Sequence, residues 1–140
     1  MSGTQHPGLE EARLRMGTYL TTHTVHSMLD PHLQADEPVK ALAHGAYEGR
    51  RGLLALTDRR LLFAQDAHSG GGSRSCPLED IRSVEWTRHG NPGTITVRTA
   101  RGCHELRRVS LRDGAVLVDE LRASLAELPA EPSVELSSAP

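Results

Sequence analysis

The sequence predicts a mainly β domain of the α+β class. We expect a seven-stranded barrel or sandwich, closed by a C-terminal amphipathic helix and preceded by an N-terminal helical extension. Three observations predict it: the apolar period changes from helical to strand-like at Val39, seven short strand-like runs follow between turn residues, and helical spacing returns after Ser110. The 140 residues suit one domain, divided into an extension (1–36), a core domain (37–128) and a tail (129–140).

The N-terminal extension carries apolar residues at helical spacing. They predict one helix over 9–29, with a single apolar face made of Leu9, Ala12, Met16, Tyr19 or Leu20, and His23. The helix should end at Asp30, because a residue that precedes proline avoids the helical region. Its apolar face needs a cover, which is either the chain's own barrel or a second copy, and self-association is the preferred alternative.

The central part of the chain alternates between apolar and polar residues in short runs. We expect strands at 39–44, 53–57, 60–65, 74–77, 81–88, 94–99 and 103–109. The segments 48–52, 69–73 and 89–93 are rich in glycine and other turn residues, so they are expected to be connections. Pro77 cannot donate a main-chain hydrogen bond, which favours an edge position for the fourth strand.

The C-terminal part predicts one helix and a tail. Ser110 is a suitable N-cap, with Asp113 three residues later, and an apolar stripe follows over 111–127. The stripe consists of Val118, Leu121, Leu125 and Leu128. Residues 129–140 hold three prolines, three serines and no basic residue, so we expect disorder there.

Composition excludes several function classes. No apolar run reaches transmembrane length, and the N-terminus lacks the basic and apolar regions of a signal peptide, so a cytoplasmic protein is expected. Four aromatic residues are too few for base stacking, and a net charge of −2 does not suit a nucleic-acid partner. Cys76 and Cys103 have no metal-site spacing and are expected to be buried or half-buried free thiols.

Three motifs give the sequence a family resemblance. Residues 52–63 have the pattern G-x-L-x-L-T-x-x-R-L-x-F, 77–84 have P-L-x-x-I-x-x-V, and 93–97 have G-x-I-x-V. In this order they resemble the bacterial pleckstrin-homology and GRAM-like group, in particular its short YokE-like domains. The resemblance covers about 37–127 and implies a pleckstrin-homology-like barrel. It says little about the ligand, because this fold serves many functions.

Four arginines are the candidate site. The resemblance implies that the first, third and sixth loops meet at one open end, which would gather Arg50, Arg51, Arg74 and Arg101 against an anion or a lipid headgroup. Residues 48–108 hold 11 arginines and 7 acidic residues, whereas both flanks are acidic. A merely solvated surface is the simpler interpretation, because arginine is this chain's common cation. Arg59 and Arg60 lie in the opposite hairpin and are interpreted as structural.

Other candidate chemistry is weaker. His23 and His26, with His32 nearby, could present imidazoles to a metal, but no acidic ligand recurs on that face. Gly70, Gly71 and Gly72 are followed by no lysine or helix of the kind that binds phosphate. Trp86 shares its predicted strand face with Val84, which favours core packing over an exposed anchor. We expect no catalytic residue, metal or cofactor.

The sequence therefore predicts a non-enzymatic interaction module. It would bind a protein partner, or itself, through sheet edges or the surface beside the C-terminal helix. The alternative is weak peripheral binding to anionic lipid headgroups through the loop arginines.

Overall fold

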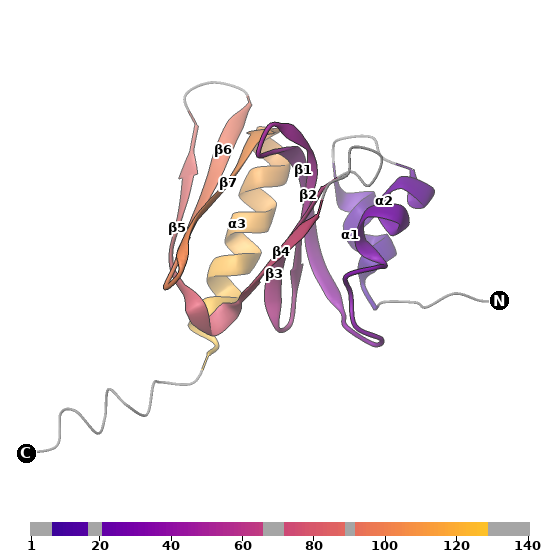
Figure 1. Ribbon diagram of the computed structural model, residues 1–140, viewed down its shortest axis with the longest axis horizontal. Helices are drawn as coiled ribbons and strands as arrows, with labels where there is room; N and C mark the ends of the chain where they lie inside the picture. The colour runs from indigo at the N-terminus through magenta and orange to yellow at the C-terminus, as the bar shows by residue number, and fades with distance from the viewer. Residues whose placement is uncertain (1–6, 17–20, 66–71, 89–91, 129–140) are drawn as a thin grey trace, which may run out of the picture.

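The computed structural model describes residues 7–16, 21–65, 72–88 and 92–128. The expected Gly-rich loop, most of the turn before β6, the segment 17–20 and the tail lie outside the described residues. The elements, in chain order, are α1 (Leu9–Arg15), α2 (Thr22–Leu29), β1 (Val39–Tyr47), β2 (Arg50–Thr57), β3 (Arg60–Gln65), β4 (Ser73–Pro77), the 3₁₀ turn η2 (Leu78–Asp80), β5 (Ile81–Thr87), β6 (Gly93–Thr99), β7 (Gly102–Val109) and α3 (Leu111–Ala126). The predicted fold class, with seven strands before one helix, is confirmed (Figure 1).

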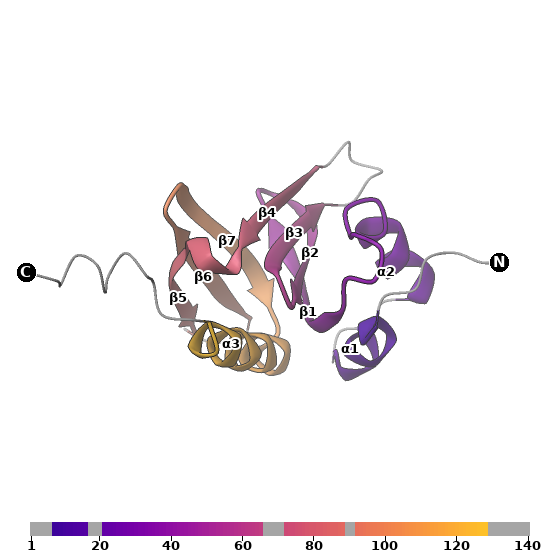
Figure 2. The same cartoon turned by 90° about the horizontal axis from the view of Figure 1, so that it is seen from below.

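The seven strands form one antiparallel sheet that folds back on itself. Their order is β4-β3-β2-β1-β7-β6-β5. β1 and β7 are joined by a single residue pair, Ala46 with Arg107, so the sheet turns sharply there and its two halves enclose a core. α3 packs against β1, β5 and β6 and closes one side of this sandwich (Figure 2).

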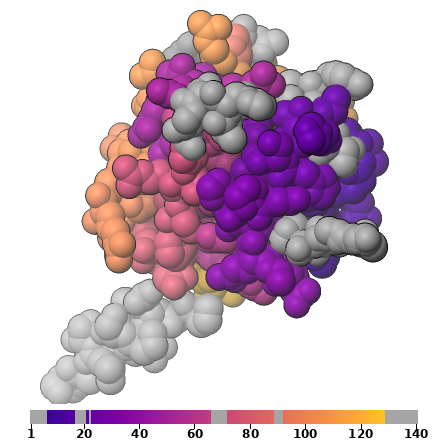
Figure 3. All heavy atoms as spheres, turned by 45° about the vertical axis from the view of Figure 1, so that its right-hand side comes forward, coloured from indigo at the N-terminus to yellow at the C-terminus, as the bar shows by residue number. Residues whose placement is uncertain are grey.

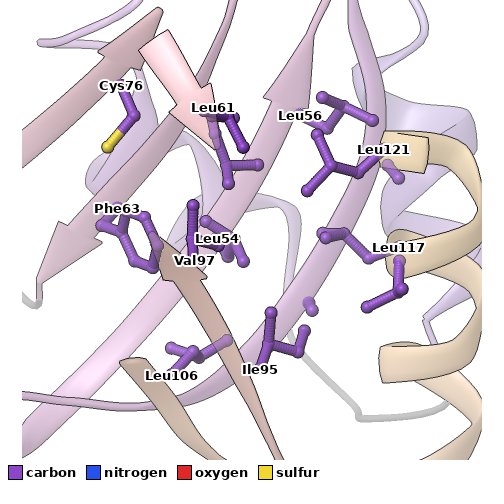
Figure 4. Close-up of a cluster of buried hydrophobic side chains, with 14 of the residues drawn as sticks. Leu54, Leu56, Leu61, Phe63, Cys76, Ile95, Val97, Leu106, Leu117 and Leu121 are labelled. Atoms are coloured by element: carbon purple, nitrogen blue, oxygen red, sulfur yellow. The ribbon is translucent and has the colours of Figure 1, made fainter. Parts of the chain in front are cut away.

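The inner core is made by alternate residues of the strands and by one face of α3 (Figure 4). Val118 and Leu121 are buried as the stripe predicts, Leu125 is half-buried, and Leu128 is exposed. Ser110 caps α3 by accepting a hydrogen bond from the main-chain N–H of Asp113 at 3.1 Å, as expected. A local cap and a local stripe were therefore sufficient to place this helix.

The N-terminal prediction of one helix over 9–29 is wrong. α1 ends at Arg15, Met16 is already extended (φ −67°, ψ 134°), and the Thr21 side chain caps a second helix by accepting from the N–H of Thr24. Threonine favours a cap over a helix interior, because its hydroxyl bonds nearby main-chain groups. His23 is consequently exposed, and the buried face of α2 is made by other residues, namely Val25, Met28 and Leu29.

A second apolar cluster covers the outer face of β1, β2 and β3. It joins the buried side chains of α1 and α2 to outward-facing strand residues, which are Val39, Leu42, Leu53, Ala55, Leu62 and Ala64. Figure 3 shows the indigo and purple residues of the two helices as a layer over this side of the molecule. The chain's own sheet thus covers the apolar face of the extension, and no second copy is needed to do so.

The first hairpin is tighter than expected. β1 continues past His44 to Tyr47, and only Glu48 and Gly49 separate it from β2, so 50–52 belong to the strand. Both turn residues have positive φ, 53° for Glu48 and 80° for Gly49. This backbone matches the twist of the flanking strands, which explains how two residues suffice.

Candidate functional site

Two of the four predicted arginines line one hollow at the open end of the sandwich. Arg74, near the start of β4, and Arg101, in the β6–β7 turn, border a hollow of 160 Å³ together with Asp80 and His104. Both arginines are exposed. The structure thus brings two of the four arginines to one hollow, although Arg74 belongs to strand β4 and not to a loop, and Asp80 adds one carboxylate to the same lining.

Arg50 and Arg51 are not among the residues that line this hollow. Successive strand residues point to opposite faces, so Arg50 shares the inner side of its partner Tyr47, whereas Arg51 lies on the outer face with Leu53. Arg51 instead faces His44, whose pKa is lowered by burial and then by the charge of Arg51. The sequence did not reveal this separation, because the register was unknown.

An aromatic cluster that the sequence analysis missed lies beneath the hollow. Tyr47 stacks on Phe63 with ring centroids 4.9 Å apart, and the Tyr47 hydroxyl lies 3.3 Å from Nδ1 of His104. Burial, followed by the charge of Glu48, raises the pKa of Tyr47 to about 12. Burial and then the charge of Arg74 lower the pKa of His104, which favours the neutral form of its ring.

A second hollow of 640 Å³ continues from the other side of His104, between the β1–β2 turn and β7. It contains Arg107 and Arg108 but also Glu48 and Glu105, and Arg107 pairs with Glu105 at 3.1 Å. Its charges are therefore balanced, so the open end as a whole is only weakly selective for anions.

The sheet has two edge strands, β4 and β5. β4 has five residues and ends at Pro77, which lacks a main-chain N–H, as the sequence predicts for an edge. β5 has seven residues, none of them proline. β5 is therefore the better template for an added strand.

The main chain of β5 faces outward at Val84. The Val84 carbonyl accepts a hydrogen bond from Nη2 of Arg122 on α3 at 3.2 Å, so it points away from β6. In an antiparallel pair, residues alternate between bonding the partner strand and facing away from it. Val84 and Trp86 thus present their main-chain groups to the outer edge, while Ser83 and Glu85 bond β6.

Apolar side chains lie beneath this edge, between β5 and α3. Val84, Trp86 and Leu125 are half-buried and pack on the inner core. The Trp86 ring sits over Gly114, where a Cβ would fall 2.0 Å from a ring carbon, so glycine is required there. We call the outward edge of β5, with Val84, Trp86, Arg122 and Leu125, the β5–α3 seam.

The Trp86 ring packs on the core, as expected, but the side chain is half-buried rather than fully buried. Its indole N–H has no hydrogen-bond partner among the described residues.

Among the residues that the structure describes, the histidines and cysteines do not assemble a metal centre. His23 is exposed, Nδ1 of His26 lies 3.0 Å from Asp30, and Nδ1 of His32 lies 3.1 Å from the Ser73 hydroxyl. In the described ranges, no group of three or more His, Cys, Asp or Glu could hold a metal ion. Both cysteines are free thiols, one buried at 76 and the other exposed at 103. Among the helices described, none is long and apolar enough to span a membrane.

Comparison with known proteins identifies the fold. The structure is similar to the C-terminal domain of an unknown protein from Leishmania infantum, with a TM-score of 0.54, 17% identity, and coverage of 65% of this chain and 86% of that one. It is also similar to the Vps36 N-terminal PH domain, with a TM-score of 0.50, 16% identity, and coverage of 67% and 83%. No family model and no curated protein sequence matches the chain. At these identities the likeness shows the fold alone, which is pleckstrin-homology-like.

Proposed function

We propose that this chain is a non-enzymatic interaction module that binds an extended segment of a protein partner along β5, beside α3. The observation that carries this proposal is the outward-facing main chain at Val84, set directly above the half-buried side chains of Trp86 and Leu125. We further infer, from the three sequence motifs, that the chain belongs with the bacterial YokE-like and GRAM-like domains and acts in the cytoplasm.

The chemistry of the seam suits strand addition. An extended peptide gains main-chain hydrogen bonds from an edge strand, and its alternate side chains can then contact the apolar floor. The hydrogen bonds supply affinity for almost any sequence, while the floor favours apolar residues at alternate positions. The seam offers main-chain hydrogen-bonding groups on a few residues of β5 and an apolar floor beside one turn of α3.

The two edges of the sheet allow a matched test. The hydrogen bond from the Gln65 N–H to the Gly72 carbonyl fixes the β3–β4 alternation, so the Ser75 N–H faces outward on β4, as the Val84 N–H does on β5. Val84→Pro and Ser75→Pro therefore each remove one outward N–H from one edge. Thermal melts of both variants establish that they fold.

The experiment selects binders from a random-peptide phage library on the wild-type protein, then measures their affinities for both variants. We expect binding to weaken about fivefold or more in Val84→Pro, because one net main-chain hydrogen bond is lost, and to persist in Ser75→Pro. Binders that are insensitive to Val84→Pro, or a library that yields none, would contradict the proposal. Binders that resemble a segment of this chain would identify a second copy as the partner.

Contact with anionic headgroups is the second candidate. It rests on the pair Arg74 and Arg101, which border the same hollow at the open end. β4, which carries Arg74, lies across the sandwich from α3 (Figure 2), and the hollow shares no lining residue with the β5–α3 seam, so the two candidate sites are separate. Substituting this pair should therefore leave peptide binding at the seam unchanged.

A further inference from the structure

The guanidinium of Arg122 occupies a main-chain acceptor that a strand added to β5 would need. It donates to the Val84 carbonyl, the same acceptor that an added strand would use for its own N–H. In the described part of the chain, Arg122 has no carboxylate partner. Asp119, one turn earlier on α3, forms no ion pair with it, although both side chains are exposed. An arginine with unused donors thus sits at an outward-facing acceptor of the edge.

We propose that the β5–α3 seam selects extended peptides that carry a carboxylate beside Val84, and that Arg122 binds this carboxylate. The inference rests on the proposed function, because it names the peptide chemistry that the same seam accepts. When the peptide N–H bonds the Val84 carbonyl, the guanidinium is released from it. Its planar fork then offers two parallel donors to an aspartate or glutamate of the peptide.

The charge that stands at the outward Val84 carbonyl is positive, which favours an acidic peptide. Arg82 near the start of β5 and Arg88 just past its end add positive charge along the strand. Glu85 is the acidic residue of β5, and alternation turns its side chain to the face opposite Val84 and Trp86. Arg82 shares that opposite face with Glu85, because its neighbour Ile81 packs on the inner core, so Arg122 is the charge that stands beside the outward main chain of Val84.

The other role for Arg122 is protection of an exposed edge. A charged side chain that covers an outward carbonyl prevents unwanted strand pairing. The two roles predict opposite results when Arg122 is removed. If Arg122 protects the edge, it competes with every peptide, so Arg122→Ala would strengthen binding. If Arg122 binds the carboxylate of the peptide, it contributes to affinity, so Arg122→Ala would weaken binding.

The test uses the peptides selected from the random library on the full chain. We expect aspartate or glutamate to be enriched at one position of the aligned peptides. Replacing that residue by its amide, or Arg122 by alanine, should each weaken binding about fivefold, and the double change should cost little more than either single change. Arg122→Lys should restore only part of the affinity, and added salt should reduce the effect.

Arg112→Ala is the matched control, since it removes an exposed arginine from the first turn of the same helix. It should leave the affinities unchanged. Peptides that depend on Val84 but show no acidic enrichment, no coupling to Arg122, or tighter binding to Arg122→Ala would overturn this inference while the proposed function stands. Loss of the dependence on Val84 would overturn both.

Discussion

Glu37 is the buried acid that ties the segment before β1 to the β2–β3 hairpin. Its carboxylate accepts hydrogen bonds from the Thr57 hydroxyl and from Nε of Arg60, both at 2.8 Å, and from the Gln34 N–H at 3.0 Å. Burial raises the pKa of Glu37, but these hydrogen bonds, with Arg60 first, together lower it to about 2. The structural role predicted for Arg60 is thus confirmed by its hydrogen bonds to a buried carboxylate.

This pKa makes stability depend on pH. A depressed carboxyl pKa stabilises the folded state above the ordinary value of 4.5, and the stabilisation is lost as pH falls towards 2. A shift of this size corresponds to about 3 kcal/mol. Urea unfolding of the wild type between these pH values should show the loss. Glu37→Gln should be destabilised by about 3 kcal/mol at neutral pH, because Arg60 keeps its charge without a carboxylate.

A control separates Glu37 from the general effect of acid. Glu85→Gln removes an exposed carboxylate from β5 and should keep the wild-type dependence of the unfolding free energy on pH. Glu37→Gln should flatten that dependence between pH 4.5 and 2. Equal slopes for Glu37→Gln and the wild type would show that Glu37 does not carry the effect.

Glu48 has a backbone conformation that lowers the stability of the folded protein. Its φ of 53° is left-handed, a region that asparagine and glycine tolerate better than glutamate. Glu48→Asn should therefore stabilise the protein by about 0.5–1 kcal/mol and raise Tm by about 2–4 °C. Gly49→Ala, at φ 80°, should have the opposite sign. A lower Tm for Glu48→Asn would mean that the carboxylate contributes more than its backbone costs.

At the scale of elements, sequence patterns predicted the helices and strands whose position is determined by residues close together in the chain. Alternation located every strand to within a few residues, and the Ser110 cap located α3. The same approach failed at 9–29, where one stripe was drawn across a break that the Thr21 cap reveals. The sequence predicted sheet edges or the surface beside the C-terminal helix as the binding region, but it did not locate the β5–α3 seam, because the bond from Arg122 to Val84 joins a side chain to a main-chain atom 38 residues away.

The α1–α2 layer should be required for the stability of the sheet it covers. Without residues 1–36, the outer face of β1–β3 would expose six apolar side chains to water, which invites association. We expect the chain 37–140 to aggregate or to melt well below the full chain, although it contains every strand. The sequence-based boundary at 36 would then mark a change of pattern, not of an independent folding unit.

Light scattering and thermal melts test this layer, and removal of 129–140 is the matched deletion. We expect that second deletion to leave Tm unchanged, because the segment has little apolar surface to bury. A monomeric 37–140 chain with a Tm close to that of the full chain would show that the layer contributes little.

At the scale of the whole molecule, one candidate surface borders β4 and the other borders α3, and these two elements lie across the sandwich from each other (Figure 2). The two edges of the sheet thus lie beside surfaces that offer different chemical groups to a ligand. The β4 side offers two exposed arginines at a hollow of mixed polarity, and the β5 side offers main-chain groups beside half-buried apolar side chains. Because the two share no residue, a peptide and an anion could be held at the same time without competition.

The charges at the open end determine the affinity with which it can bind an anionic membrane. A basic side chain near an anionic surface contributes about 1 kcal/mol, so Arg74 and Arg101 supply about 2 kcal/mol, short of the roughly 4 kcal/mol of a millimolar affinity. Asp80 opposes them in the same hollow, whose lining offers no large apolar side chain for insertion. Attachment through this end should therefore be weak.

We accordingly expect little co-sedimentation with phosphatidylserine or phosphoinositide vesicles at physiological salt. Binding should rise at low salt, where the charges are less screened, and should be lost in the double variant Arg74→Ala and Arg101→Ala. Arg50→Ala with Arg51→Ala is the comparison, and because these two residues do not line the hollow, it should remove less of the binding. Tight, salt-resistant sedimentation of the wild type would make lipid recognition the primary function and the seam secondary to it.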